Sequence, residues 1–285
     1  MEQPTSVAHA ARVESASPAV SFEHVTFAFD DHVVLRDVSF TIPRGGMSIV
    51  LGASGSGKSV LLKLTMGLLR PDSGTIRVDG KQISVMNEAE LMQIRGGIGM
   101  LFQEGALFDS LTVDENVGYH LYEETNMPRD QAHARVVDVL RFIGLEDYID
   151  RLPSELSGGQ KRRVAIARAI AAKPNLLLFD DPTTGLDPII AATVDDEIVK
   201  LRDLEHVTCI VVTHQIRDAF YMTYHEAGLE GHKPRIRALP QEGPGRARFM
   251  VLQEGQICFE GSPAELLASP DRYLREFLFM TLPPW

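Results

Sequence analysis

The 285-residue sequence contains only two cysteines and no long apolar run. Cys209 and Cys258 lie far apart, without a CxxC pair or a companion histidine cluster, which argues against a disulfide framework and a zinc site. Both lie in apolar, strand-like runs, where we expect them to pack as small hydrophobic side chains. No stretch reaches the roughly 18 uninterrupted apolar residues that a membrane-spanning helix needs.

Positive charge is also scarce, with 28 Lys and Arg residues against 39 Asp and Glu residues and a formal net charge of -11. Because broad nucleic-acid binding needs clustered cations that displace counterions, this balance predicts no nucleic-acid partner. The N-terminus lacks the charged-then-apolar pattern of a signal peptide. The composition is that of a globular protein, and we expect a cytoplasmic chain that reaches a membrane only through a partner.

Changes of composition along the chain predict its organisation. Residues 1–20, rich in Ala, Ser and Pro, predict a mobile tail. Apolar patterns then follow in the order strand, helix, strand, which is typical of a parallel α/β sheet. A mainly helical stretch of about residues 104–172 predicts a subdomain inserted into that sheet. The polar segment of about 224–247 predicts an inserted loop. Residues 266–285 finish on apolar and aromatic side chains, which predicts a docked C-terminal tail.

The octapeptide GASGSGKS follows the strand pattern MSIVL and precedes a leucine-rich helix pattern, which is the context that a phosphate-binding P-loop requires. Its glycines let backbone N–H groups converge on phosphate oxygens, Lys58 reaches the β- and γ-phosphates, and Ser59 can ligate Mg²⁺. An incidental lysine in a glycine-rich turn is the alternative. The residues expected at the nucleotide are Gly52, Ser54, Gly55, Gly57, Lys58, Ser59 and Val60.

Two adjacent carboxylates end the apolar run LLLFDD. Asp180 fits the description of a Walker B aspartate, which holds Mg²⁺ through its water shell at the end of a buried strand. A helix-capping aspartate is the alternative for this residue. With the P-loop, Asp180 indicates a P-loop NTPase, and kinases, GTPases, helicases and transporters all remain open at this point.

The pentapeptide LSGGQ resembles the signature motif of ABC ATPases. Ser157 can cap the helix that follows, and Gly158 and Gly159 permit close backbone approach next to Gln160, which makes a second anion site at a helix N-terminus. The resemblance implies a P-loop NTPase fold of the ABC ATPase type over about residues 21–265. Such a fold has a RecA-like mixed sheet core, an antiparallel β subdomain and an inserted helical subdomain. It also implies a head-to-tail homodimer, with ATP sandwiched between the P-loop of one copy and the signature of the other.

Four further positions match the motifs of that family. Phe29 lies where the family stacks an aromatic ring on adenine, and a core phenylalanine is the alternative. Gln103 resembles the Q-loop glutamine, which senses Mg²⁺ and the attacking water and which we count among the metal ligands. The run TGLD, which ends at Asp187, resembles the D-loop that crosses the dimer interface. His214 resembles the switch histidine that contacts the γ-phosphate, whereas a lone histidine at a strand end is usually structural.

The basic run KRRVAIARAIAAK begins directly after the signature. Helical spacing places Val164, Ala167 and Ala171 on one face and the charged side chains elsewhere. We therefore expect a solvated amphipathic helix, in which Arg162 and its neighbours face water, instead of a nucleic-acid surface.

The run FQEGALFDSLTV resembles ATPases of lipid-trafficking transporters of the Mla type, also described as toluene-tolerance or organic-solvent-resistance systems. Leu107, Phe108 and Leu111 would form the apolar groove wall for a coupling helix of a permease. The resemblance implies integral-membrane permease subunits as partners, together with a substrate-binding or small regulatory subunit. It places the chain at the cytoplasmic face of the inner membrane.

Asp181 occupies the position where ABC ATPases normally carry the glutamate that orients and polarises the attacking water. Its side chain is one methylene shorter, which withdraws the carboxylate by roughly 1 to 1.5 Å, and a misplacement of about 1 Å can cost on the order of a hundredfold in rate. We therefore expect Mg-ATP binding with slow hydrolysis. An ABC transporter of a polar solute or lipoprotein and a soluble ABC switch protein are the alternatives to a lipid transporter.

Overall fold

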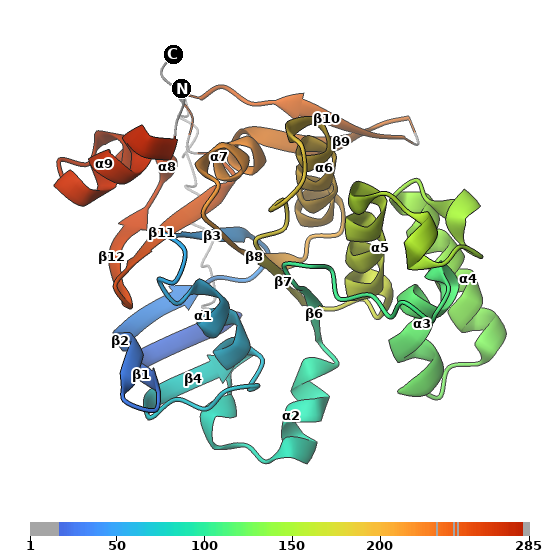
Figure 1. Ribbon diagram of the computed structural model, residues 1–285, viewed down its shortest axis with the longest axis horizontal. Coiled ribbons are helices and arrows are strands. Elements are labelled where there is room, and N and C mark those ends of the chain that lie inside the picture. The colour runs from blue at the N-terminus through green and yellow to red at the C-terminus, as the bar shows by residue number, and fades with distance from the viewer. Residues whose placement is uncertain (1–16, 232, 242, 244, 282–285) are drawn as a thin grey trace, which may run out of the picture.

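A mixed six-stranded sheet forms the centre of the protein in a computed structural model that describes residues 17–231, 233–241, 243 and 245–281 (Figure 1). Its strand order is β12-β11-β3-β8-β7-β6. Five of the strands run parallel, and β12 pairs antiparallel with β11. The strands are β3 (Met47–Leu51), β6 (Ile98–Leu101), β7 (Leu176–Asp180), β8 (Thr208–Thr213), β11 (Ala247–Gln253) and β12 (Gln256–Gly261).

A second, four-stranded antiparallel sheet packs beside the first, with the order β2-β1-β4-β5. Helix α1 lies between the two sheets (Figure 1). The strands are β1 (Val20–Phe29), β2 (His32–Ile42), β4 (Ser73–Val78) and β5 (Lys81–Gln82). Strand β2 of this sheet packs on the P-loop, because Val34 and Leu35 lie against Gly57.

The helices cover both faces of the central sheet, and α3, α4 and α5 form a group at one side of it (Figure 1). The helices are α1 (Lys58–Thr65), α2 (Glu88–Arg95), α3 (Val113–Glu123), α4 (Arg129–Phe142), α5 (Gly158–Ala171), α6 (Pro188–Leu204), α7 (Ile216–Tyr224), α8 (Pro263–Ala268) and α9 (Arg272–Thr281). Short 3-10 turns occupy Ile83–Val85, Glu146–Tyr148 and Pro153–Glu155. None of the helices in the described part of the chain combines the length and the apolar character that a bilayer crossing requires.

Alternate residues of the central strands enter two different hydrophobic clusters. In β8, Cys209 and Val211 pack in the cluster that includes α3 to α6, whereas Ile210 and Val212 pack in the cluster shared with α1 and the antiparallel sheet. Parallel strands that are buried on both faces in this way appear in sequence as continuous apolar runs. This explains why strands ending at Asp180 and just before His214 can be predicted from sequence.

The segment expected to be a loop over 224–247 contains a β-hairpin, so that expectation is wrong for most of its length. Strands β9 (His225–Glu230) and β10 (Lys233–Ala238) pair antiparallel. Ala227 and Ile236 face each other across the pair and pack against the main core. An isolated two-stranded hairpin is marginal in water, and this one is stabilised by packing on α6, which local composition does not reveal.

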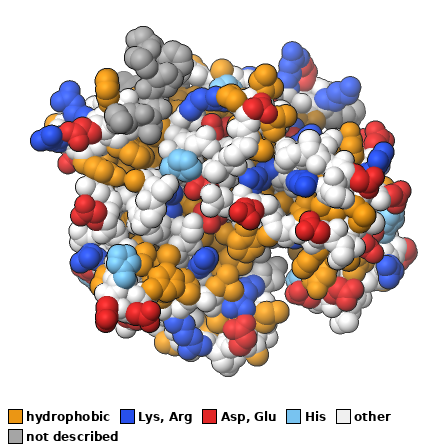
Figure 2. Space-filling view, viewed as in Figure 1, with side chains coloured by type: hydrophobic (Ala, Val, Ile, Leu, Met, Phe, Trp, Pro, Cys, Tyr) orange, Lys and Arg blue, Asp and Glu red, His pale blue; other side chains and the backbone are white. Residues whose placement is uncertain are grey.

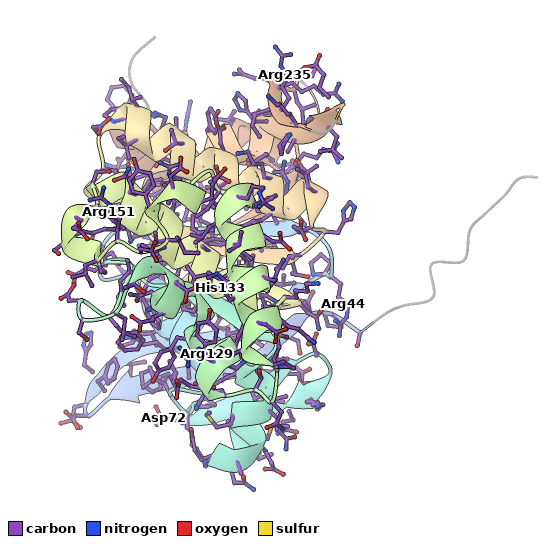
Figure 3. All side chains as sticks on the ribbon, turned by 90° about the vertical axis from the view of Figure 1, so that its right-hand side faces the viewer. Arg44, Asp72, Arg129, His133, Arg151 and Arg235 are labelled. Carbon is purple, nitrogen blue, oxygen red and sulfur yellow. The ribbon has the colours of Figure 1, made fainter. Side chains whose placement is uncertain are left out.

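Two neighbouring side chains near the end of α6 hold this hairpin. Arg202, which is 4% exposed, donates through Nη2 to the carbonyl of His225 at 2.7 Å and through Nη1 to that of Met222. The Oδ2 atom of Asp203 accepts from the backbone N–H of Ala227 at 2.8 Å. The hairpin is therefore joined to the helix that begins at the D-loop, and Arg235 marks its outer side at the top of Figure 3.

Other local expectations have mixed outcomes. Cys209 is buried as expected, but Cys258 is exposed, because its strand lies at the edge of the central sheet. In α9, Leu274 and Leu278 pack into the main core, while Phe279 is 79% exposed. Most of the predicted N-terminal tail, residues 1–16, lies outside the described residues, as do the last four residues.

Candidate nucleotide site

The P-loop joins β3 to α1, and its glycines are required by its geometry. Gly57 adopts φ +105°, and a Cβ atom there would lie 2.9 Å from Cδ2 of Leu35. A Cβ atom on Gly52 would lie 2.5 Å from the carbonyl oxygen of Leu252. Only glycine fits both demands. The loop therefore keeps its backbone N–H groups free of side chains, at the N-terminus of α1, where an anion is favoured.

Lys58 is the first residue of α1, and its side chain turns back over the loop. Its Nζ atom donates to the carbonyls of Gly52 at 2.9 Å and Ala53 at 3.0 Å. Burial lowers the pKa of Lys58, while the carboxylates of Asp181 and Asp180 raise it. The ammonium group thus lies within the loop, next to two acidic side chains, where a phosphate group would meet it.

Ser59 and Asp180 are brought together as the sequence predicts. The hydroxyl of Ser59 donates to Oδ1 of Asp180 at 2.8 Å. Burial raises the pKa of Asp180, and the hydrogen bond from Ser59 opposes that rise. A serine hydroxyl and a carboxylate are oxygen ligands of the kind Mg²⁺ takes beside substrate phosphates. The pair therefore fits that ion.

Asp181 and His214 form a second pair at neighbouring strand ends. Oδ1 of Asp181 accepts from Nδ1 of His214 at 2.8 Å and from the backbone N–H of His214 at 3.1 Å. Since the acceptor is a carboxylate, Nδ1 carries a proton. The second ring nitrogen, Nε2, takes no part in this contact. Asp181 itself adopts φ +44°, a conformation that aspartate tolerates better than most residues.

Lys58, Ser59, Asp181 and His214 line one cavity of about 400 Å³, and Asp180 lies behind its wall, bonded to Ser59. Its wall contains most of the predicted nucleotide residues together with Val34, which sequence reasoning missed. The lining residues are Val34, Ser54, Gly55, Gly57, Lys58, Ser59, Val60, Gln103, Asp181 and His214. Val34 lies on β2, and only the packing of the antiparallel sheet over Gly57 reveals its position.

The remaining predicted residues lie outside this cavity. Ser157 caps α5, because its Oγ accepts from the backbone N–H of Gln160 at 3.3 Å. Asp187 caps α6 by accepting from two backbone N–H groups at 3.1 Å. Phe29 is 48% exposed, and its ring meets that of Phe27 edge to face at 4.8 Å. Within a single chain, Ser157 of the signature and Asp187 of the D-loop therefore act as helix N-caps.

Arg162 overturns the expectation of a solvated charged face on α5. Its side chain is only 7% exposed, whereas Val164, Ala167 and Ala171 are buried as predicted. Helical spacing does not single out Arg162, because Arg163 likewise precedes a buried residue, Ile166, by three positions; the burial of Arg162 comes from the loops packed over α5. Its neighbours also bond to main chain: Arg163 donates to the carbonyl of Ile143, and Arg168 donates to those of Gly105 and Ala106.

A groove of about 350 Å³ lies between α2, β6, α3 and α5. Figure 2 shows this hollow between α2 and α3, with hydrophobic side chains on both sides. Phe108 is part of its wall. Its ring meets that of Tyr119 at a centroid distance of 4.7 Å and a tilt of 35°, and the guanidinium of Arg168 lies 5.9 Å from the Phe108 ring. Leu107 instead packs against the main core, and Leu111 does not line the groove.

A parallel sheet with a P-loop after β3 and two adjacent acidic residues at the end of β7 defines a P-loop nucleotide-binding protein. The family model described as "ABC transporter" matches residues 35–184. The chain therefore belongs to the ABC transporter family.

Named relatives show the range of this similarity. The chain is 35% identical over 265 residues to the intermembrane phospholipid transport system ATP-binding protein MlaF of Escherichia coli, covering 93% of this chain and 90% of MlaF. It is 37% identical to the chloroplastic protein TRIGALACTOSYLDIACYLGLYCEROL 3 of Arabidopsis thaliana, covering 88% and 70%. Among solved structures, the dimeric ATP-binding cassette MJ0796 bound to ADP and Pi superposes with a TM-score of 0.70 at 29% identity, covering 85% and 98%.

Proposed function

We propose that this chain is the ATP-binding and hydrolysing subunit of a membrane ABC transporter that moves phospholipid or another hydrophobic substrate. The observation that carries the proposal is the single cavity in which the P-loop, Gln103, Asp181 and His214 meet. The lipid substrate is supported by the resemblance to MlaF, whose name states phospholipid transport.

ATP binding follows from the charges of the cavity. The N–H groups of the loop and the N-terminus of α1 favour the phosphates, and Lys58 adds a cation held by two loop carbonyls. We propose Ser59, Asp180 and Gln103 as the residues that hold Mg²⁺ with the nucleotide. When bound, Mg²⁺ neutralises charge on the β- and γ-phosphates.

Hydrolysis requires a group that orients water and takes its proton. Both hydrogen bonds that hold the Asp181 carboxylate go to Oδ1. We therefore assign Oδ2 to accept the proton of the attacking water. His214 holds the carboxylate through Nδ1 and leaves Nε2 to contact the γ-phosphate. Because the Asp181 side chain is short, its carboxylate lies farther from the attacking water than a glutamate carboxylate would, and we expect hydrolysis to be slow.

The signature residues need a second copy of the chain to act on ATP. Ser157 and the N-terminus of α5 form an anion-binding helix start that lies outside the chain's own cavity. We propose a head-to-tail homodimer, in which each signature faces the P-loop of the other copy. The dimeric state of the similar cassette MJ0796, bound to ADP and Pi, supports a dimer.

The groove beside the Q-loop is the proposed docking site of the permease. Phe108 and Tyr119 supply aromatic area, and Arg95 and Arg168 supply positive charge. An amphipathic coupling helix with acidic residues would fit such a groove. Docking there would hold the chain at the cytoplasmic face of the inner membrane, where a substrate-binding or small regulatory subunit would join the complex. We propose no nucleic-acid partner.

The test is co-purification from membranes combined with ATPase assays. We expect the tagged full chain to bring down a multi-span membrane protein and to release phosphate from ATP in the presence of Mg²⁺. Phe108→Asp should weaken the co-purification without abolishing ATP binding, whereas Arg141→Gln, a surface control on α4, should leave both unchanged. A wild-type chain that binds no membrane protein and hydrolyses no ATP would contradict the proposal.

A further inference from the structure

Arg162 lies one turn into α5, directly behind the signature, and its guanidinium contacts two loops at once. Nη1 donates to the carbonyls of Phe102, at 3.0 Å, and Gln103. Nη2 donates to the carbonyl of Thr184 at 3.2 Å. One side chain therefore joins the signature helix to the Q-loop and the D-loop.

The three carbonyls belong to segments that carry catalytic groups. Gln103 lines the nucleotide cavity. Thr184 follows Asp181 closely, and its backbone N–H donates to the Asp181 carbonyl at 3.2 Å. The guanidinium thus fixes the main chain beside the proposed Mg²⁺ sensor and beside the proposed base. Only arginine offers several donors in a planar fork that can reach separate carbonyls.

The position is costly for a side chain with a purely structural role. Placing a cation in the interior requires strong compensation, and here main-chain carbonyls supply the hydrogen bonds. Burial lowers the pKa of Arg162, and the carboxylate of Glu104 opposes that effect. An apolar side chain of similar volume would avoid this cost. What the buried guanidinium provides instead is its hydrogen bonds to the two loops.

We propose that Arg162 is a positioning residue that makes the signature helix, the Q-loop and the D-loop move together when ATP binds. In the head-to-tail dimer, the signature of each copy serves the ATP held by the other copy, while Gln103 and Asp181 serve the chain's own ATP. Arg162 would thereby couple the two nucleotide sites. This inference rests on the proposed function and extends it to communication between the sites.

The test compares Arg162→Lys and Arg162→Gln with wild type in the complete transporter complex. Lysine keeps the charge but cannot bridge the separate carbonyls. We expect kcat to fall by about tenfold and the Hill coefficient for ATP to fall to about 1, while the Kd for ATP changes less than about twofold. Arg163→Gln is the matched comparison, because Arg163, on the same helix, donates to the carbonyl of Ile143 at 3.2 Å instead of to the Q-loop and D-loop carbonyls that Arg162 joins. It should keep the wild-type cooperativity.

Two results would overturn the inference. One is a folded Arg162→Lys or Arg162→Gln complex with the wild-type kcat and Hill coefficient. The other is a parallel loss of ATP binding, kcat and thermal stability, which would assign Arg162 to stability alone. Failure of the proposed function is distinguishable, because the wild-type complex itself would then show no ATP-dependent phosphate release.

Discussion

Lengthening the side chain at position 181 is the change that addresses the catalytic proposal most sharply. Asp181→Glu adds one methylene, which advances the carboxylate by roughly 1 to 1.5 Å toward the water. Asp181 is only 8% exposed and is tied to His214 through Oδ1 at 2.8 Å. The longer side chain must therefore keep its bond to the imidazole while its second oxygen moves nearer to the γ-phosphate.

The expected gain follows from that displacement. If about 1 Å of misplacement costs on the order of a hundredfold, restoring the distance raises kcat by about 10- to 100-fold. Asp181→Asn keeps the size and the contact with His214 but removes the proton acceptor, so its kcat should fall by at least about a hundredfold. The Kd for ATP should change little in both variants, because Lys58 and Ser59 are untouched.

The assay is steady-state phosphate release by the complex reconstituted with its permease. Single-turnover measurements would separate chemistry from product release. If Asp181→Glu gave no gain and Asp181→Asn no loss, the role assigned to Asp181 would be wrong. If Glu lowered kcat while Asn abolished it, Asp181 would remain the base, and the claim that it is too short would be refuted.

Three further predictions concern stability. In Gly159→Ala the new Cβ would lie 2.3 Å from Cγ2 of Ile190, so either the Ile190 side chain must change rotamer or α5 and α6 must move apart. Urea unfolding should show a free energy of unfolding lower by about 1 to 3 kcal/mol, unlike that of Gly158→Ala. Asp195 is fully buried, and burial and the nearby Asp218 raise its pKa. Above about pH 4 the folded chain therefore keeps a proton on Asp195 that the unfolded chain releases. The free energy of unfolding falls as pH rises toward the folded-state pKa of Asp195. Asp195→Asn should be more stable than wild type at pH 8 but not near pH 4 in urea titrations. Arg202→Met should lower the free energy of unfolding by about 3 kcal/mol or more and speed amide hydrogen exchange in β9. Unchanged exchange in β9 would refute the anchoring role of Arg202.

Sequence reasoning succeeds at the site wherever a short motif determines its own geometry. The P-loop is contiguous, so Lys58 and Ser59 could be placed directly. Asp180 and His214 end continuous apolar runs, and parallel strands bring such ends to one edge of the sheet. The contact between His214 and Asp181, which follows Asp180 directly, therefore follows from the order of strands and helices.

The rest depended on contacts between segments that are distant in sequence. Arg162 lies in a basic run, and its burial follows from the loops packed over α5. The β9–β10 hairpin depends on Arg202 in α6, and its own composition is that of a loop. Leu107 and Phe108 are adjacent and apolar, and only the packing of α3 and α5 decides which one lines the groove.

The most direct measurement of the central claim is ATP-dependent lipid transfer by the chain and its co-purified permease in liposomes. A fluorescent phospholipid in donor membranes would report transfer, and released phosphate would report hydrolysis in the same sample. We predict that the wild-type complex shows both, that Lys58→Ala abolishes both, and that Arg141→Gln changes neither. Transfer that continues at the wild-type rate with Lys58→Ala would contradict the account.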